Sequence, residues 1–94
     1  MKPTYKVLVD FAIKTDHTIS VFDGEEWPVK RSTDRAQIIE SIESVEQAEL
    51  TIRDASGNKV FWAFIIPFGV EPDETIADCS DNAFLKSFET YLGA

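Results

Sequence analysis

Residues 48–66 read AELTIRDASGNKVFWAFII, and this stretch decides the class of fold. Its first six residues alternate apolar and polar side chains, which is the two-residue period of a half-buried strand. Residues 54–58 are Asp-Ala-Ser-Gly-Asn, a composition typical of a tight turn. Residues 60–66 are then apolar at all seven positions. A strand of this kind belongs at the centre of a sheet, where either something covers each face or one face lies in an interface.

The chain before this hairpin predicts three further strands. Residues 5–13 place Tyr, Val, Val, Phe and Ile at every second position, so we expect a strand there. A second strand is expected over about residues 17–22, and the Asp23-Gly24 pair that follows is typical of a type I′ hairpin turn. Residues 25–29 complete a short third strand at a sheet edge, because Pro28 has no N–H to donate to a ladder.

Two helices are predicted from the spacing of apolar residues. The first begins after Asp34, the expected N-cap, for which Ser32 and Thr33 are alternatives. Its apolar stripe consists of Ile38, Ile39, Ile42 and Val45. The second helix begins after Asp81 or Ser80, and its apolar face consists of Phe84, Leu85, Phe88, Tyr91 and Leu92. Residues 75–77 are expected to add a short strand before it.

The order of elements is therefore β-β-(β)-α-β-β-(β)-α, with the short strands in parentheses. It predicts an α+β fold of two layers, an antiparallel sheet of about four to six strands with two helices packed on one face. The chain has 94 residues, so we expect a single domain over residues 1–94. No apolar run reaches the roughly 18 residues of a membrane span, and no signal peptide is evident. We therefore expect a cytoplasmic protein with no membrane partner.

The net charge of the chain is −8, and it is unevenly distributed. Residues 1–33 hold five acids and five bases, whereas residues 34–94 hold twelve acids and four bases. Residues 60–85 contain no Lys or Arg. This acidity argues against direct binding of nucleic acid, because phosphate contacts need Lys and Arg. Its simplest role is to keep a small domain dissolved and monomeric.

A sharper interpretation makes the acidic second half a binding surface for a basic, nucleic-acid-handling partner. Its carboxylates would imitate a row of phosphates, and association would be fast and sensitive to salt. The candidate partner-binding residues are seven acids: Glu40, Glu43, Glu71, Asp73, Glu74, Asp78 and Asp81. In size, acidity and lack of catalytic motifs, the chain resembles small accessory proteins of phages and mobile elements, some of which inhibit nucleic-acid-targeting machinery. This likeness is one of composition and assigns no role to any residue.

The alternative is a homodimeric domain of structural or regulatory role, which associates through its aromatic strand. The candidate self-association residues are Trp27, Phe61, Trp62 and Phe64. They are a heavy aromatic load for a small core, so one face of the 60–66 strand is available to meet a second subunit. Burial of most of these rings in the core is the competing interpretation.

Catalysis is the third possibility, and no motif supports it. The single cysteine, Cys79, is expected near a helix N-terminus that lowers a thiol pKa, but Asp78 and Asp81 beside it act in the opposite direction. The single histidine, His17, lies far away in the sequence. The acids after residue 70 lack the spacing of a calcium-binding loop. We therefore predict a small non-catalytic interaction module, an inhibitor or regulator, without a cofactor or a metal.

Overall fold

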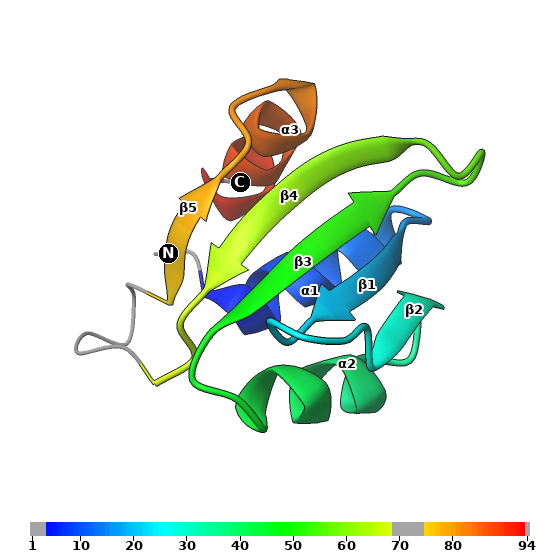
Figure 1. Ribbon diagram of the computed structural model, residues 1–94. Helices are drawn as coiled ribbons and strands as arrows, with labels where there is room; N and C mark the ends of the chain where they lie inside the picture. The colour runs from blue at the N-terminus through cyan, green and yellow to red at the C-terminus, as the bar shows by residue number, and fades with distance from the viewer. Residues whose placement is uncertain (1–3, 69–74, 94) are drawn as a thin grey trace.

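The computed structural model describes residues 4–68 and 75–93. Within them, three helices pack against a five-stranded antiparallel sheet, whose strand order is β2-β1-β3-β4-β5. Helices α1 and α3 lie behind the sheet in Figure 1, and α2 runs along its lower edge. The elements in chain order are α1 (Tyr5–Lys14), β1 (Thr18–Phe22), β2 (Val29–Ser32), α2 (Arg35–Glu43), β3 (Ala48–Arg53), β4 (Lys59–Ile65), β5 (Ile76–Cys79) and α3 (Ala83–Gly93).

The predicted α+β fold is confirmed, including the central hairpin of β3 and β4. The strand over residues 48–53 has the predicted bounds, and Asp54 organises the turn by accepting hydrogen bonds from the N–H groups of Ser56 and Asn58. Strand β4 lies between β3 and β5, so it is internal to the sheet, as its apolar sequence indicated. The short strand predicted near residue 76 is present as β5.

The strand predicted over residues 5–13 is wrong, because this segment is helix α1. The Oγ1 atom of Thr4 caps the helix by accepting a hydrogen bond from the backbone N–H of Val7. Tyr5, Leu8 and Ala12 are all buried and share one helical face. The segment is apolar at both two-residue and helical spacings, and packing against the core selects the helix. The fold consequently has three helices where two were expected.

The hairpin of β1 and β2 exists, but its connection is longer than the predicted type I′ turn. Six residues, 23–28, join the strands, and Asp23 is not among the residues with positive φ. Instead the Asp23 carboxylate accepts hydrogen bonds from the backbone N–H groups of Glu25 and Glu26, at 2.9 and 2.7 Å. Strand β2 therefore begins only at Val29, after Pro28, and it lies at the sheet edge as predicted.

The helix caps follow the prediction at one helix and differ by a residue at the other. Asp34 caps α2, since its side chain accepts a hydrogen bond from the N–H of Gln37 at 3.2 Å. Helix α3 is capped by Asn82, whose Oδ1 accepts from the N–H groups of Phe84 and Leu85. The predicted caps Asp81 and Ser80 lie just outside the helix, where Ser80 pairs with β4 through Trp62 instead.

The core lies between the helices and one face of the sheet. Alternate residues of the strands point into it, and they are fully or nearly fully buried: Ile19, Val21, Ala48, Leu50, Ile52, Phe61, Ala63 and Ile65. Strand pairing places these residues beside one another, for example Ile19 beside Ile52, and Ile52 beside Phe61. The intervening residues of the same strands must therefore point to the opposite face, away from the helices.

Candidate binding surface

The face of the sheet opposite the helices carries a group of large, half-exposed side chains. We call this face the open face and define it by outward residues of the three middle strands with one neighbouring loop residue: Ser20, Phe22, Glu49, Thr51, Arg53, Trp62, Phe64 and Trp27. Ser20 and Thr51 are small and buried, and the larger side chains around them are half-buried or exposed. Trp27 is 43% exposed, and its ring lies 4.9 Å from that of Phe22. Exposed rings on an unoccupied sheet face are typical of interaction surfaces.

One end of the open face combines aromatic rings with carboxylates. Phe22, Glu49, Phe64 and Asp78 are successive cross-strand neighbours, so their side chains form a row across β1, β3, β4 and β5. The indole Nε1–H of Trp62 donates a hydrogen bond to Oε1 of Glu49 at 2.9 Å. This contact fixes one carboxylate oxygen against the sheet and leaves the other available to a ligand.

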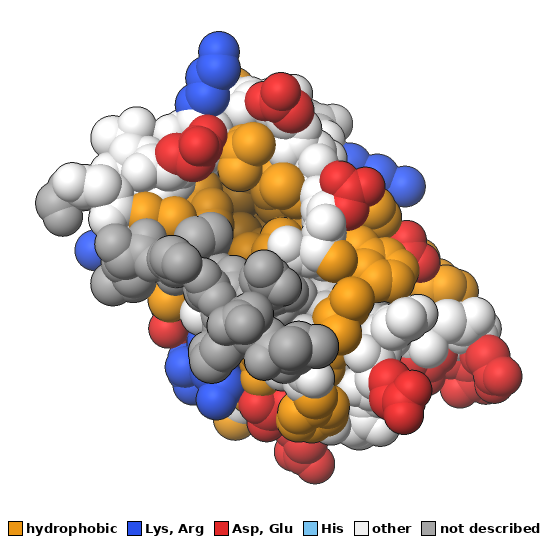
Figure 2. Space-filling model, turned by 90° about the vertical axis from the view of Figure 1, so that its left-hand side faces the viewer, with side chains coloured by type: hydrophobic (Ala, Val, Ile, Leu, Met, Phe, Trp, Pro, Cys, Tyr) orange, Lys and Arg blue, Asp and Glu red, His pale blue; other side chains and the backbone are white. Residues whose placement is uncertain are grey.

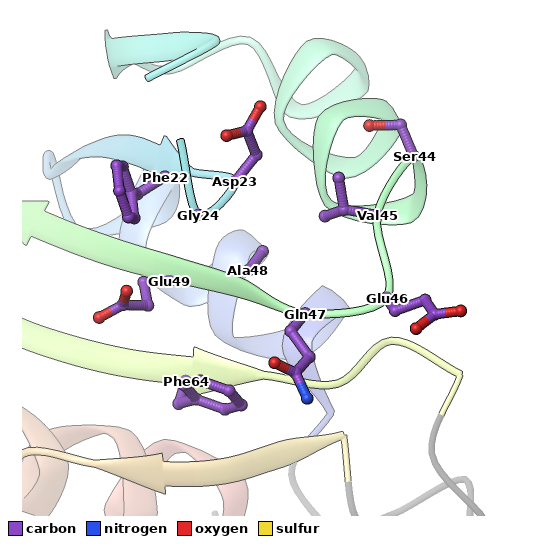
Figure 3. A pocket seen from close by; sticks show the side chains of 10 residues that line it. All are labelled: Phe22, Asp23, Gly24, Ser44, Val45, Glu46, Gln47, Ala48, Glu49 and Phe64. Carbon is purple, nitrogen blue, oxygen red and sulfur yellow. The ribbon is translucent and has the colours of Figure 1, made fainter. Parts of the chain in front are cut away.

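A hollow of about 550 Å³ opens at this end, and we call it the acidic hollow. Figure 3 shows Phe22, Glu49 and Phe64 side by side on adjacent strands, with Asp23 and Glu46 farther out. The other residues that line the acidic hollow are Gly24 and four residues at or near the connection between α2 and β3: Ser44, Val45, Gln47 and Ala48. Hydrogen bonds from the backbone of Glu26 and Glu25 lower the pKa of Asp23, so this carboxylate is charged at neutral pH. Two phenylalanines and three acidic residues thus line one hollow, and the three carboxylates point in different directions (Figure 3).

The other end of the open face is basic. Lys30, Arg31 and Arg53 line a second hollow of about 310 Å³ together with Ser20 and Trp27, and we call it the basic hollow. Oγ of Ser20 accepts hydrogen bonds from the backbone N–H of Arg31 at 2.9 Å and from Nη1 of Arg53 at 3.2 Å. The charge on the open face therefore changes from negative at one end of the strands to positive at the other. The net charge of the whole chain does not reveal this difference.

The seven acids predicted as a partner surface do not form one row in the described part of the chain. Glu40 is exposed on α2, and Glu43 on the same helix accepts a hydrogen bond from Tyr5 and pairs with Lys6 at 3.6 Å. Asp78 lies beside Phe64 at the open face, and Asp81 is exposed before α3. Figure 2, which views the molecule from the β5 side, shows acidic side chains as separate patches around a hydrophobic centre. Glu71, Asp73 and Glu74 lie outside the described residues.

Three acidic residues that line the acidic hollow are not among the seven candidates. The sequence predicts Asp23 as a turn residue, whereas Glu46 and Glu49 continue the three-residue spacing of Glu40 and Glu43. Alternation in residues 48–53 predicts that Glu49 points away from the core. Residues 60–65 are apolar throughout, so only the strand pairing shows that Phe64 shares this face. The position of Asp23 depends on the six-residue connection and was not predictable.

Of the four aromatic residues predicted for self-association, three lie on the open face. Trp62 and Phe64 are half-exposed there, and Trp27 flanks them. Phe61 does not belong with them, since it is 4% exposed in the core and its ring centroid lies 4.8 Å from that of Phe84. The reason is the alternation of a strand, which sends neighbours such as Phe61 and Trp62 to opposite faces.

The cysteine and the histidine do not form a nucleophile and base. Burial, followed by the charges of Asp78, Asp81 and Glu89, raises the pKa of Cys79, so the thiol is protonated at neutral pH. The ring centroids of His17 and Phe84 lie 5.1 Å apart in a T-shaped arrangement. His17 also lines a hollow of about 500 Å³, and Cys79 is not among the residues that line it. Across residues 4–68 and 75–93, no three His, Cys, Asp or Glu side chains gather as metal ligands.

Comparison of the chain with family models, with curated proteins and with solved structures finds no match. None of the helices described has the length and apolar character that crossing a membrane requires.

Proposed function

We propose that the protein works by binding a basic partner protein and that the acidic hollow is its principal contact. In this role it is an inhibitor or regulator of a nucleic-acid-handling protein, the class whose working surfaces are richest in Lys and Arg. The observation that supports the proposal is one hollow lined by two phenylalanines and three acidic residues.

The chemistry of this hollow suits the side chain of an arginine or a lysine. The flat faces of Phe22 and Phe64 offer contact to a cation, an interaction worth roughly 0.5–2 kcal/mol depending on how far water is excluded. Glu49 offers an oriented carboxylate, and charge-assisted hydrogen bonds of this kind are about twice as strong as neutral ones. Asp23 and Glu46 extend the negative field around the opening. The hollow therefore favours a cationic group over a neutral one of equal size.

The overall charge of −8 supports the same class of partner at longer range. A strongly negative protein attracts a basic partner before contact, which raises the rate of association at low salt. Candidate acids away from the hollow, such as Glu40 and Asp81, contribute to this field without contacting the partner. Their replacement is expected to slow association and to leave dissociation largely unchanged.

An arginine peptide tests the proposal, with the Trp62 indole N–H as the reporter. We expect an acetylated tetra-arginine peptide to shift this N–H signal in ¹⁵N-correlated spectra, because the donor is bonded to Glu49. Glu49→Gln keeps the shape of the side chain and an oxygen acceptor for Trp62, and it is expected to weaken binding several-fold. Added salt is expected to weaken binding to the unmodified protein as well.

The matched control is Glu89→Gln, which removes the same charge from an exposed position on α3. It should bind the peptide almost as well as the unmodified chain, because only the long-range field changes. Equal weakening by both variants would show non-specific attraction and would contradict a defined hollow. Failure of the Trp62 signal to move at saturating peptide would remove the proposal altogether.

A further inference from the structure

We propose that the open face also binds a second copy of this chain, face to face, around a two-fold axis that lies in the interface and crosses the strands. The proposal goes beyond the binding of a basic partner, and it rests on the charge complementarity of the two ends of the open face. One chain carries both the acidic hollow and the basic hollow, so the acidic end of one copy can face the basic end of the other.

Strand β3 defines the geometry. Glu49 lies at the acidic end and Arg53 at the basic end, and both point to the open face with Thr51 midway between them. Four residues of a strand span about 13 Å, so the two charges are well separated. A two-fold axis across the strands at Thr51 reverses the strand direction. It therefore brings Glu49 of each copy opposite Arg53 of the other.

The middle of the open face combines two buried polar residues, Ser20 and Thr51, with the half-exposed ring of Trp62. Ser20, Thr51 and Trp62 are cross-strand neighbours, so Trp62 lies at the level of the axis and faces its own symmetry mate. Phe22 and Trp27 flank this row. Two sheets that pack face to face stand about 10 Å apart, which leaves room for interleaved aromatic side chains. The rings that are half-exposed in one chain are thereby covered.

The second copy and the basic partner would occupy the same surface. Self-association then covers the acidic hollow, so the monomer is the form that binds a basic partner. The negative charge of −8 on each copy opposes association. We therefore expect a dimer of moderate affinity that forms with rising concentration.

Sedimentation equilibrium over a range of concentrations tests the dimer in the unmodified chain. We expect the apparent mass to rise from that of one chain towards that of two. Two variants test the geometry: Glu49→Arg leaves a base at both ends of β3, and Arg53→Glu leaves an acid at both ends of β3. Each is expected to weaken self-association about tenfold or more, because like charges meet twice across the axis.

Mixing these two variants provides the decisive measurement. In the mixture a base faces an acid at both positions of β3 across the axis, so a heterodimer is expected to form more tightly than the homodimer of either variant. The matched controls are Glu40→Arg and Lys86→Glu, exposed reversals on α2 and α3 that should leave dimerisation intact. Circular dichroism verifies the fold of each variant, and Glu49→Gln and Arg53→Gln replace any reversal that does not fold.

Two outcomes would overturn this inference. One is a strict monomer at the highest attainable concentration of the unmodified chain. The other is a mixture of folded variants that stays monomeric. Neither outcome bears on the arginine-peptide experiment, which is carried out on dilute protein and reads one hollow only, so the two proposals fail separately.

Discussion

The hydroxyl of Tyr5 makes one of the side-chain links between α1 and α2. It donates a hydrogen bond to Oε2 of Glu43, while Lys6 pairs with the same carboxylate at 3.6 Å. The ring itself is buried at the base of α1. Tyr5→Phe removes the hydroxyl and keeps the ring, so we expect a loss of about 1–2 kcal/mol in the free energy of unfolding. Urea denaturation at neutral pH measures it.

The same contact predicts a dependence on alkaline pH. Burial and the hydrogen bond to Glu43 raise the pKa of Tyr5 above its ordinary value of 10.0. As the pH rises past 10, the unfolded chain loses this proton before the folded chain does. The contribution of Tyr5 to the free energy of unfolding is therefore fully present below about pH 10 and is lost as the pH rises further. Between about pH 8 and about pH 11, the unmodified protein should therefore lose more stability than Tyr5→Phe does. Equal losses would contradict the raised pKa.

Cys79 gives a second prediction for an individual residue. Because burial and nearby acids raise the pKa of its thiol, reaction with iodoacetamide at neutral pH is expected to be several-fold slower than that of a free cysteine. The double variant Asp78→Asn, Asp81→Asn removes two of the charges and should accelerate the reaction. Glu25→Gln, on an exposed loop, serves as the control for a general change of charge. An unchanged rate in the double variant would show that Asp78 and Asp81 do not slow the reaction.

At the level of elements, helix α1 predicts that shortening two neighbouring side chains destabilises the fold to very different extents. Leu8 is fully buried on the helix face that meets the core, whereas Val7 is only partly buried. Leu8→Ala is expected to cost about 2–5 kcal/mol and Val7→Ala much less. A strand over residues 5–13 would reverse this order, because Val7 would then point inward. Denaturant unfolding of the two variants measures the difference directly.

The elements with one clear period were predictable from the sequence, and the ambiguous one was not. Residues 48–53 alternate strictly, and they form a strand with the predicted bounds. Residues 5–13 carry apolar side chains at both spacings, and the β-branched Val7, Val9 and Ile13 favoured the strand interpretation. Contacts with α2 and α3 decide the matter in favour of the helix, and such contacts are not readable from a local pattern.

The candidate site was predictable in its ingredients and not in its arrangement. The aromatic rings of β4 and the excess of acid were evident in the sequence. Which rings share a face with which acids depends on strand register and on the six-residue connection before β2, both of which are tertiary. The alternation rule alone would have separated Phe61 from Trp62, and that step was available from the sequence.

The whole molecule carries more negative charge than its ion pairs neutralise. Among residues 4–68 and 75–93, two ion pairs are formed, Lys6 with Glu43 and Arg35 with Asp10. The remaining acids repel one another more strongly in the folded chain than in the expanded one. We therefore expect the melting temperature to rise between about 0.01 M and about 0.5 M sodium chloride, as screening weakens the repulsion. A fall in melting temperature would show that attraction between the surface charges outweighs their repulsion.

The placement of the two tryptophans has a practical consequence for spectroscopy. Trp27 and Trp62 are the only tryptophans in the chain, and both lie at the open face. The described core holds aliphatic residues, phenylalanines and Tyr5 instead. Intrinsic fluorescence will consequently change little when the core loosens and strongly when something covers the sheet. Emission maximum and quenching by acrylamide thus report occupancy of this surface, while global unfolding is better followed in the far ultraviolet.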